Sequence, residues 1–173
     1  MIRTFGDYLV WLYPVEGTTD EKVPGDAGGE TKFGIDAADH PGVNIASLTG
    51  SEAAMIYNAE FERSHAFELP SPLCWVSFDD RENCGEREAV KLLQRALGVP
   101  EDGLFGPVTR AAAHGGDALA LALRLIAVRV AFYKQLAAEQ PIKSKFLPGW
   151  LNRMGSLKVA ILPDPEPSTQ AVS

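Results

Sequence analysis

Two carboxylates near the N-terminus have the residue type and setting needed for acid–base chemistry. Glu16 follows an apolar segment and precedes a Gly-rich polar loop, which is where the edge of a cleft is expected. Packed apolar neighbours would favour the proton-bearing form of its carboxyl group, as a general acid requires. Asp26 lies in the turn Gly25-Asp26-Ala27-Gly28-Gly29 and would stay ionised. Two carboxyl groups in such unlike surroundings suit cleavage of a glycosidic bond, although isolated acids at a helix end and in a turn are more often structural.

Other chemistries have less support from the sequence. His40, His65 and His114 are scattered and form no His-Glu-x-x-His pair, and there is no Cys-x-x-Cys, so neither a metal nor another cofactor is expected. Cys74 and Cys84 are too few for a disulfide framework and are expected to be free thiols. A Cys/His hydrolase remains an alternative, because such partners meet in space rather than in sequence.

The elements that must position these residues are mainly helical. Apolar residues recur at helical spacing over several segments, Thr49-Gly50-Ser51-Glu52 has the form of a capping box, and Gly98 is expected to stop a helix. Pro14 should end or bend the first helix. A loop or small hairpin is expected around residues 31–35. The expected helices cover residues 5–15, 50–61, 73–80, 86–97, the segment after Pro107, and 117–138.

Composition limits the class of protein. The chain has 173 residues, of which 46% are hydrophobic and 23% charged, so it should form one globular domain or two small lobes. No apolar run approaches the roughly 20 residues of a membrane helix, and a net charge of −7 disfavours a nucleic-acid partner. We expect a catalytic lobe over 1–86, a helical lobe over 87–158 and a disordered, Pro-rich tail over 159–173.

An ordered series of motifs runs through most of the chain. Its first part is Glu16-Gly17 followed by Asp26-Ala27-Gly28-Gly29-Glu30-Thr31-Lys32-Phe33-Gly34-Ile35. Its later parts are Phe78-Asp79-x-x-x-Asn83-x-Gly85, Leu92-Leu93-Gln94-x-x-Leu97-Gly98, Asp102-Gly103-x-x-Gly106-Pro107-x-Thr109 and Phe146-x-x-Gly149-Trp150-Leu151-Asn152-Arg153. This series resembles glycoside hydrolase family 108, the phage endolysins and secretion-associated muramidases, and its last part is similar to the family's peptidoglycan-binding part.

The resemblance implies a lysozyme-like helical fold with one small β-hairpin near the catalytic glutamate. It also implies hydrolysis of the β-1,4 bond between N-acetylmuramic acid and N-acetylglucosamine, with Glu16 as general acid. Asp26 and Thr31 are similar in spacing to the residues that hold the attacking water in phage-type lysozymes, and Asp20 is the competing second acid. This arrangement implies an inverting reaction, which needs roughly 6.5 to 9.5 Å between the two carboxyl groups.

Substrate contacts follow from the same resemblance and are assigned to Gly28, Gly29, Lys32, Asn83 and Trp150. Asn83 is expected to be buried and to support the hairpin or the cleft floor. Trp150, like Trp11 and Trp75, is also typical of a core position.

The chain departs from the family at positions that affect sugar contacts. Thr18 replaces a glycine, the aromatic residue that usually follows is absent, Glu62 replaces a tryptophan, and Glu82 replaces an apolar residue before Asn83. A catalytically degenerate peptidoglycan-binding protein is therefore one alternative, and a Cys-dependent cell-wall amidase or peptidase is the other.

The charges divide unevenly along the chain. Residues 1–86 carry 5 Lys and Arg against 16 Asp and Glu, whereas residues 87–173 carry 11 against 7. Like charges around Glu16 would help to keep it protonated, and the basic half would be attracted to the anionic cell wall. We expect a monomer made in the bacterial cytoplasm without a clear signal peptide, which reaches the wall or periplasm through a holin or a secretion system.

Overall fold

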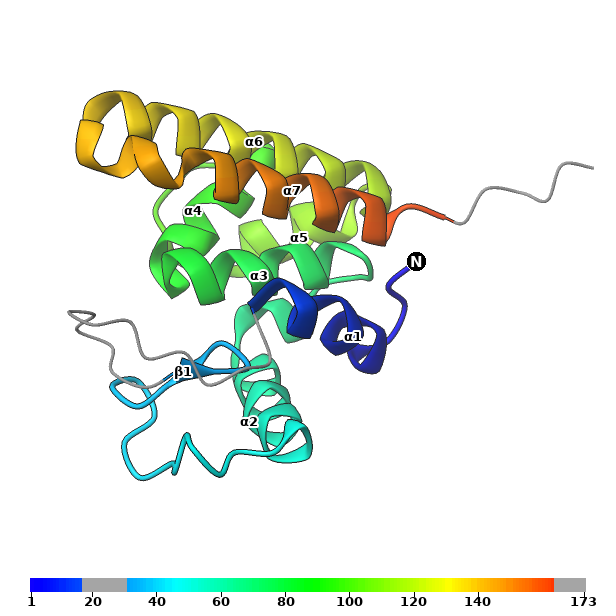
Figure 1. Ribbon diagram of the computed structural model, residues 1–173. Coiled ribbons are helices and arrows are strands. Elements are labelled where there is room, and N and C mark those ends of the chain that lie inside the picture. Colours follow the sequence, from blue (N-terminus) through cyan, green and yellow to red (C-terminus); the bar gives the residue numbers. More distant parts are fainter. Residues whose placement is uncertain (17–30, 164–173) are drawn as a thin grey trace, which may run out of the picture.

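Helices make up most of the computed structural model, which describes residues 1–16 and 31–163 (Figure 1). A two-stranded antiparallel hairpin lies beside α2, on the far side of α3 from α6 and α7. The predicted mainly helical, lysozyme-like fold with one small hairpin is confirmed. In chain order the described elements are α1 (Phe5–Glu16), β1 (Thr31–Lys32), β2 (Ile35–Asp36), α2 (Gly50–Arg63), the 3-10 helix η1 (His65–Glu68), α3 (Leu73–Cys84), α4 (Glu86–Leu97), α5 (Pro107–His114), α6 (Ala118–Glu139), the 3-10 helix η2 (Pro141–Phe146) and α7 (Leu147–Ile161).

Local signals in the sequence account for most helix ends. The capping box of α2 is present, with the Thr49 side chain accepting from the Glu52 backbone and the Glu52 side chain accepting from the Thr49 backbone. Gly98 ends α4 in the left-handed conformation, which costs glycine little. Pro107 occupies the first turn of α5, and Asp117 caps α6 by accepting from the amide of Ala120 at 2.7 Å.

Two helices extend further than the sequence predicted, and a third contains its proline. Pro14, expected to end or bend the first helix, lies inside α1, which ends at Glu16, as the sequence predicted for this residue. Since Val10 is exposed, the carbonyl that loses its bond to residue 14 can bind water instead. The helix predicted over 73–80 continues to Cys84 as α3. Finally, α7 extends to Ile161, which is fully buried, whereas the tail was expected from residue 159; residues 164–173 of that tail lie outside the described residues.

Both halves of the chain contribute to one hydrophobic core. Every residue of α3 from Leu73 to Asp80 is buried, because α3 packs against both α4 and α6. The core cluster joins Tyr8 and Leu12 of α1 to side chains of α6 and α7. Within the part of the chain that the structure describes, no helix is both long and apolar enough to cross a membrane. The shared core holds α1 and α7 in fixed relative positions, and this geometry determines the surroundings of Glu16.

Candidate active site

Glu16 is the last residue of α1 and contacts Arg153 of α7. Arg153 Nη1 lies 2.5 Å from Glu16 Oε1, and the side chains are 10% and 27% exposed, respectively. A carboxylate and a guanidinium at this distance form a charge-assisted contact, which is stronger than a neutral hydrogen bond. The sequence predicted acidic neighbours around Glu16, but the described residues add a cation to its environment.

Arg153 is itself held on several sides. Its Nη2 and Nε donate to Asp79 Oδ1 at 2.5 and 3.1 Å, and its guanidinium lies 5.5 Å from the centre of the Trp11 ring. Burial disfavours the charged form, but Asp79 and Glu16 outweigh it and raise the pKa of Arg153. Arg153 therefore stays cationic and orients the Glu16 carboxyl group.

A fully buried ion network continues behind Arg153. Arg129 Nη1 lies 2.5 Å from Asp79 Oδ2 and 2.6 Å from Asp80 Oδ1, and Arg129 Nε donates to Tyr133 Oη at 2.8 Å. Burial raises the pKa of Asp80 to about 7. Burial also acts on Asp79, but Arg153 and Arg129 hold the pKa of that carboxyl below its usual range. The network ties α3 to α6 and α7, so the orientation of Glu16 depends on the packing of the whole helical part.

The hairpin turn packs against the other side of Glu16. Phe33 and Gly34 form the two-residue turn between β1 and β2, with φ angles of 56° and 79°, as hairpins of this length require. Tyr57 Oη donates to the carbonyl of Phe33 at 2.9 Å. A Cβ atom at Gly34 would lie 2.6 Å from Tyr57 Oη and 2.9 Å from Glu16 Cγ. Only glycine fits at this position, both for its φ angle and for its distance to Glu16.

Gly34→Ala should therefore lower the free energy of unfolding more than Gly42→Ala. Gly42 has a φ of 101° and nothing within 4 Å of its Cβ position, so alanine there adds only backbone strain of about 1–2 kcal/mol. At Gly34 the same strain is joined by overlap with Glu16 and Tyr57, which adds about 1–3 kcal/mol. Urea denaturation of both variants measures the difference; equal losses would show that the turn does not press on Glu16.

A polar pocket of about 470 Å³ lies beside this turn and includes Gly34 among its lining residues. Glu82 and Glu60 also line it. Burial, and secondly the charge of Glu60, raise the pKa of Glu82 to about 7, and Glu82 Oε1 pairs with Arg81. Glu60 Oε1 lies 3.1 Å from His40 Nε2, while its buried Oε2 has no hydrogen-bond partner among the described residues. The polar pocket thus contains Glu82, a carboxyl group whose pKa of about 7 lies near neutral pH.

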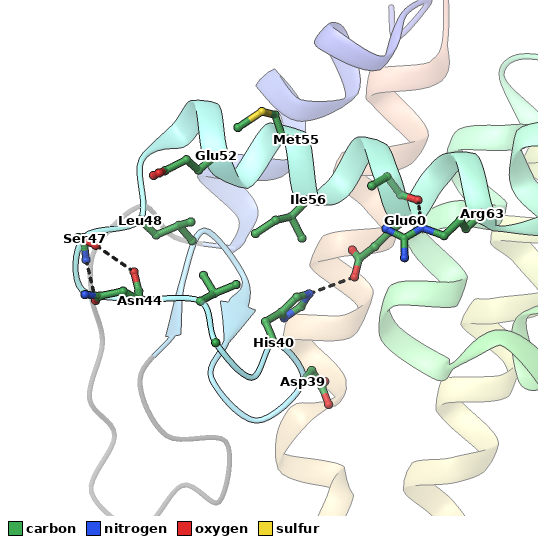
Figure 2. A pocket seen from close by; sticks show the side chains of 13 residues that line it. Asp39, His40, Asn44, Ser47, Leu48, Glu52, Met55, Ile56, Glu60 and Arg63 are labelled. Atoms are coloured by element: carbon green, nitrogen blue, oxygen red, sulfur yellow. Dashed lines mark hydrogen bonds and ion pairs between the residues drawn. The ribbon is translucent and has the colours of Figure 1, made fainter.

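A larger pocket, of about 700 Å³, lies between α2 and the loop that follows β2 (Figure 2). Figure 2 shows His40 reaching across to Glu60, while Leu48 and Ile56 form part of the apolar wall. The two pockets share Asp39, His40 and Glu60, so they meet at the His40–Glu60 pair. Glu16 lines neither pocket, but the polar pocket includes Gly34, whose Cβ position lies 2.9 Å from Glu16 Cγ. The polar pocket is therefore the better candidate for the reaction site.

The structure describes only some of the predicted site residues of the N-terminal part. Thr31 and Lys32 form β1 and are half-buried. Lys32 Nζ donates to the carbonyl of Ala46 at 3.3 Å and lies 5.7 Å from the centre of the Phe33 ring, which ties it to the neighbouring loop. The following predicted residues lie outside the described part of the chain and remain predictions: Asp20, Asp26, Gly28 and Gly29.

The structure describes the two remaining predicted substrate contacts, Asn83 and Trp150. Asn83 is exposed, contrary to the expectation of burial, because it lies in the last turn of α3, where its Nδ2 donates to the carbonyl of Asp79 at 2.8 Å. Trp150 is half-buried and stacks on Tyr133, with ring centres 4.7 Å apart. Asn83 lines the polar pocket beside Gly34, whereas Trp150 lines a separate pocket.

The cysteines are poorly suited to nucleophilic catalysis. Both are free thiols, and burial raises the pKa of Cys74 to about 12 and also raises that of Cys84. A thiolate is the reactive form of cysteine, so these surroundings make both side chains inert at neutral pH. Across residues 1–16 and 31–163, no three His, Cys, Asp or Glu side chains are grouped as a metal site.

Sequence reasoning gave no role to the ion network. Arg129 was detectable in principle, because it continues the i, i+4 series of Leu121 and Leu125 on the buried side of α6. A charged residue in such a series requires a buried partner of opposite charge. Asp79 and Arg153 occur in the motif series, but nothing in their spacing indicated that they would meet.

Comparison with known proteins agrees with the fold. The family described as "Glycosyl hydrolase 108" matches residues 10–85, and the family described as "Predicted Peptidoglycan domain" matches residues 88–155. The solved structure of Brucella abortus SagA is similar, with a TM-score of 0.74 and 27% sequence identity over 92% of this chain and 96% of that one. No curated protein matches the chain. Residues 10–85 therefore form a glycoside hydrolase 108 domain, and the chain is a muramidase that acts on peptidoglycan and carries a peptidoglycan domain after this segment.

Proposed function

We propose that Glu16 is the general acid that cleaves the β-1,4 bond between N-acetylmuramic acid and N-acetylglucosamine. The observation that carries this assignment is the contact of Glu16 with Arg153, beside Gly34, which lines the polar pocket. A general acid must be held in one orientation toward the leaving oxygen, because misplacement by about 1 Å can cost about 100-fold in rate. Arg153 on one side and Gly34 on the other supply that restraint.

In this mechanism Glu16 Oε1 stays on Arg153 while Oε2 carries the proton. As the bond between the sugar carbon and the glycosidic oxygen breaks, Oε2 transfers its proton to that oxygen, and positive charge develops on the sugar. Asp26, with Thr31, holds a water molecule that attacks the sugar carbon from the opposite face and gives its proton to Asp26. The reaction consumes one water and inverts the configuration, as the family resemblance implies.

The other predicted substrate contacts belong to the same proposal. Lys32 lies in β1, which leads into the Phe33–Gly34 turn beside Glu16, whereas Gly28 and Gly29 lie outside the described residues. Asn83 lines the polar pocket next to that turn and is exposed, so its carboxamide is accessible to a glycan.

Product analysis of digested peptidoglycan tests the proposed reaction. Cleavage by a muramidase creates new reducing ends on N-acetylmuramic acid, which borohydride converts to the corresponding sugar alcohol. Mass spectrometry should find these alcohols in fragments that keep their stem peptides. Reducing ends on N-acetylglucosamine, or release of peptides from intact glycan strands, would contradict the assignment.

Arg153→Gln should lower kcat by about 100-fold with little change in KM, because the Glu16 carboxyl loses the group that orients it. Arg153→Lys should keep part of the activity, since an ammonium group preserves the charge but cannot bind Asp79 and Glu16 in the same fixed geometry. Steady-state kinetics on soluble peptidoglycan fragments, at a temperature where melting curves show both variants to be folded, measures the effect.

A purely structural role for Arg153 gives a different result. Activity would then follow the folded fraction of each variant, and kcat per folded molecule would stay at the wild-type value. A rise in KM at constant kcat would instead make Arg153 a substrate-binding residue.

A further inference from the structure

A separate pocket of about 350 Å³ opens beside the turn between α6 and α7, and neither Glu16 nor the hairpin lines it. It lies within the segment that matches the peptidoglycan domain, except for its lining residues from the end of α3. Its apolar wall consists of Phe132, Tyr133, Leu136, Phe146 and Trp150, and its polar rim includes Asn83, Glu88 and Lys143.

The aromatic rings of this pocket form an ordered stack. Trp150 lies on Tyr133 at 4.7 Å with an interplanar angle of 19°, and Phe146 lies against Trp150 at 5.9 Å and 33°. Tyr133 is buried and its hydroxyl accepts from Arg129, so the inner end of the stack is fixed by the ion network. Phe146 at the outer end is 50% exposed. The wall is therefore formed before any ligand arrives, and part of it faces solvent.

The lining has the chemical character of a saccharide site. A pyranose ring presents C–H groups on its faces and hydroxyl or acetamido groups at its edges, so it needs flat apolar surface and a few polar partners. Aromatic rings supply the flat apolar surface, with little entropy lost on binding. The Asn83 carboxamide and the Lys143 ammonium, at the rim, supply the polar partners.

The position of the pocket points to the same ligand as the reaction site. Asn83 lines both this pocket and the polar pocket that includes Gly34, whose Cβ position lies 2.9 Å from Glu16 Cγ. In Figure 1 the α6–α7 turn and the β1 hairpin lie toward the same side of the molecule. A polymer lying across the polar pocket can thus continue past Asn83 to the aromatic stack.

We propose that the pocket lined by Phe146 and Trp150 binds a sugar of the same peptidoglycan glycan strand that is cut at Glu16. This rests on the proposed function and names the part of the peptidoglycan that the C-terminal segment holds: the glycan rather than the stem peptide. An additional sugar site outside the cleavage position favours long strands over short fragments, because each further sugar adds contacts only when the strand reaches it.

Binding in a Glu16→Gln background tests the proposal without cleavage. Calorimetry with glycan strands freed of their stem peptides should show that Phe146→Ala weakens binding by roughly threefold to tenfold. Short strands of one disaccharide unit should bind equally well with and without the substitution. Ile142→Ala is the matched control, because Ile142 lies on the same η2 segment, is 78% exposed and does not line the pocket.

Each outcome of this experiment decides between ligands. Loss of affinity for free stem peptides, with glycan affinity unchanged, would make the pocket a peptide site and overturn the proposal. Equal affinity of Phe146→Ala and Ile142→Ala for long strands would also overturn it, as would absence of binding to peptide-free strands. If Glu16→Gln retains activity, the catalytic assignment fails. Binding of glycan fragments that the enzyme does not cleave still measures the effect of Phe146→Ala independently.

Discussion

Glu16→Gln should lower the turnover of peptidoglycan by about 100- to 10,000-fold, which is the range that a general acid contributes. Glutamine keeps the shape of the side chain and can still contact Arg153, but its carboxamide has no proton to give to the glycosidic oxygen. Affinity for peptidoglycan should stay near the wild-type value, since the pocket keeps its form. Release of reducing ends from purified cell walls measures turnover, and co-sedimentation with the same walls measures binding.

Glu139→Gln is the matched control for this substitution. Glu139 is the last residue of α6, is exposed, and accepts from Gln135, away from the polar pocket. It should keep full activity. If Glu16→Gln keeps more than about one tenth of wild-type turnover, Glu16 contributes less than the rate factor expected of a general acid, and another group, of which Glu82 is the first candidate, must supply the proton.

Arg129→Met should produce the largest loss of stability, about 3–5 kcal/mol, because it leaves the charge of a fully buried carboxylate without a partner. Methionine retains much of the side-chain length, so the loss is mainly electrostatic. The difference from wild type should shrink as the pH falls from 7 toward 4. Burial already raises the pKa of Asp80 to about 7, and a protonated Asp80 no longer carries a buried charge. Urea denaturation at several pH values measures both effects.

Two further variants define the cause of this loss. Arg110→Met removes an arginine from an exposed pair with Glu68, in which the two side chains are 42% and 45% exposed, and it should change stability little. Adding Asp80→Asn to Arg129→Met should restore part of the lost stability, because it removes the stranded charge, whereas Asp79 keeps Arg153 as its partner. A double variant less stable than Arg129→Met alone would show that lost packing, rather than stranded charge, dominates.

The ion network has a consequence for the organisation of the chain. Asp79 and Glu16 lie in the segment that matches the hydrolase family, whereas Arg129 and Arg153 lie in the segment that matches the peptidoglycan domain. The contacts between them are fully or largely buried. The C-terminal segment therefore does more than attach to the wall, since its α7 supplies the cation against which the proposed general acid rests.

Local structure was predictable because its causes are local. The capping box at Thr49 and the helix stop at Gly98 each depend on residues within one helical turn, and both lie where the sequence placed them. The β-like stretch at residues 31–35 predicted a loop or a small hairpin, and the structure has a hairpin there. The C-terminal end of α7 was not predictable from local signals, because Ile161 is helical only through its burial in the shared core.

The sequence by itself determined the helical fold, the hairpin, the position of Glu16 at a helix end and the family resemblance. Only the tertiary structure decided that Arg153 contacts Glu16, that Asp79 and Asp80 share the buried Arg129, and that Asn83 is exposed between two pockets. The physical reason is that periodicity and capping report on neighbours along a helix, whereas the partner of a buried charge is chosen by how distant helices pack. Arg129 illustrates the difference. Its position on the apolar side of α6 requires a buried partner of opposite charge, and only the packing of α3 against α6 identifies that partner.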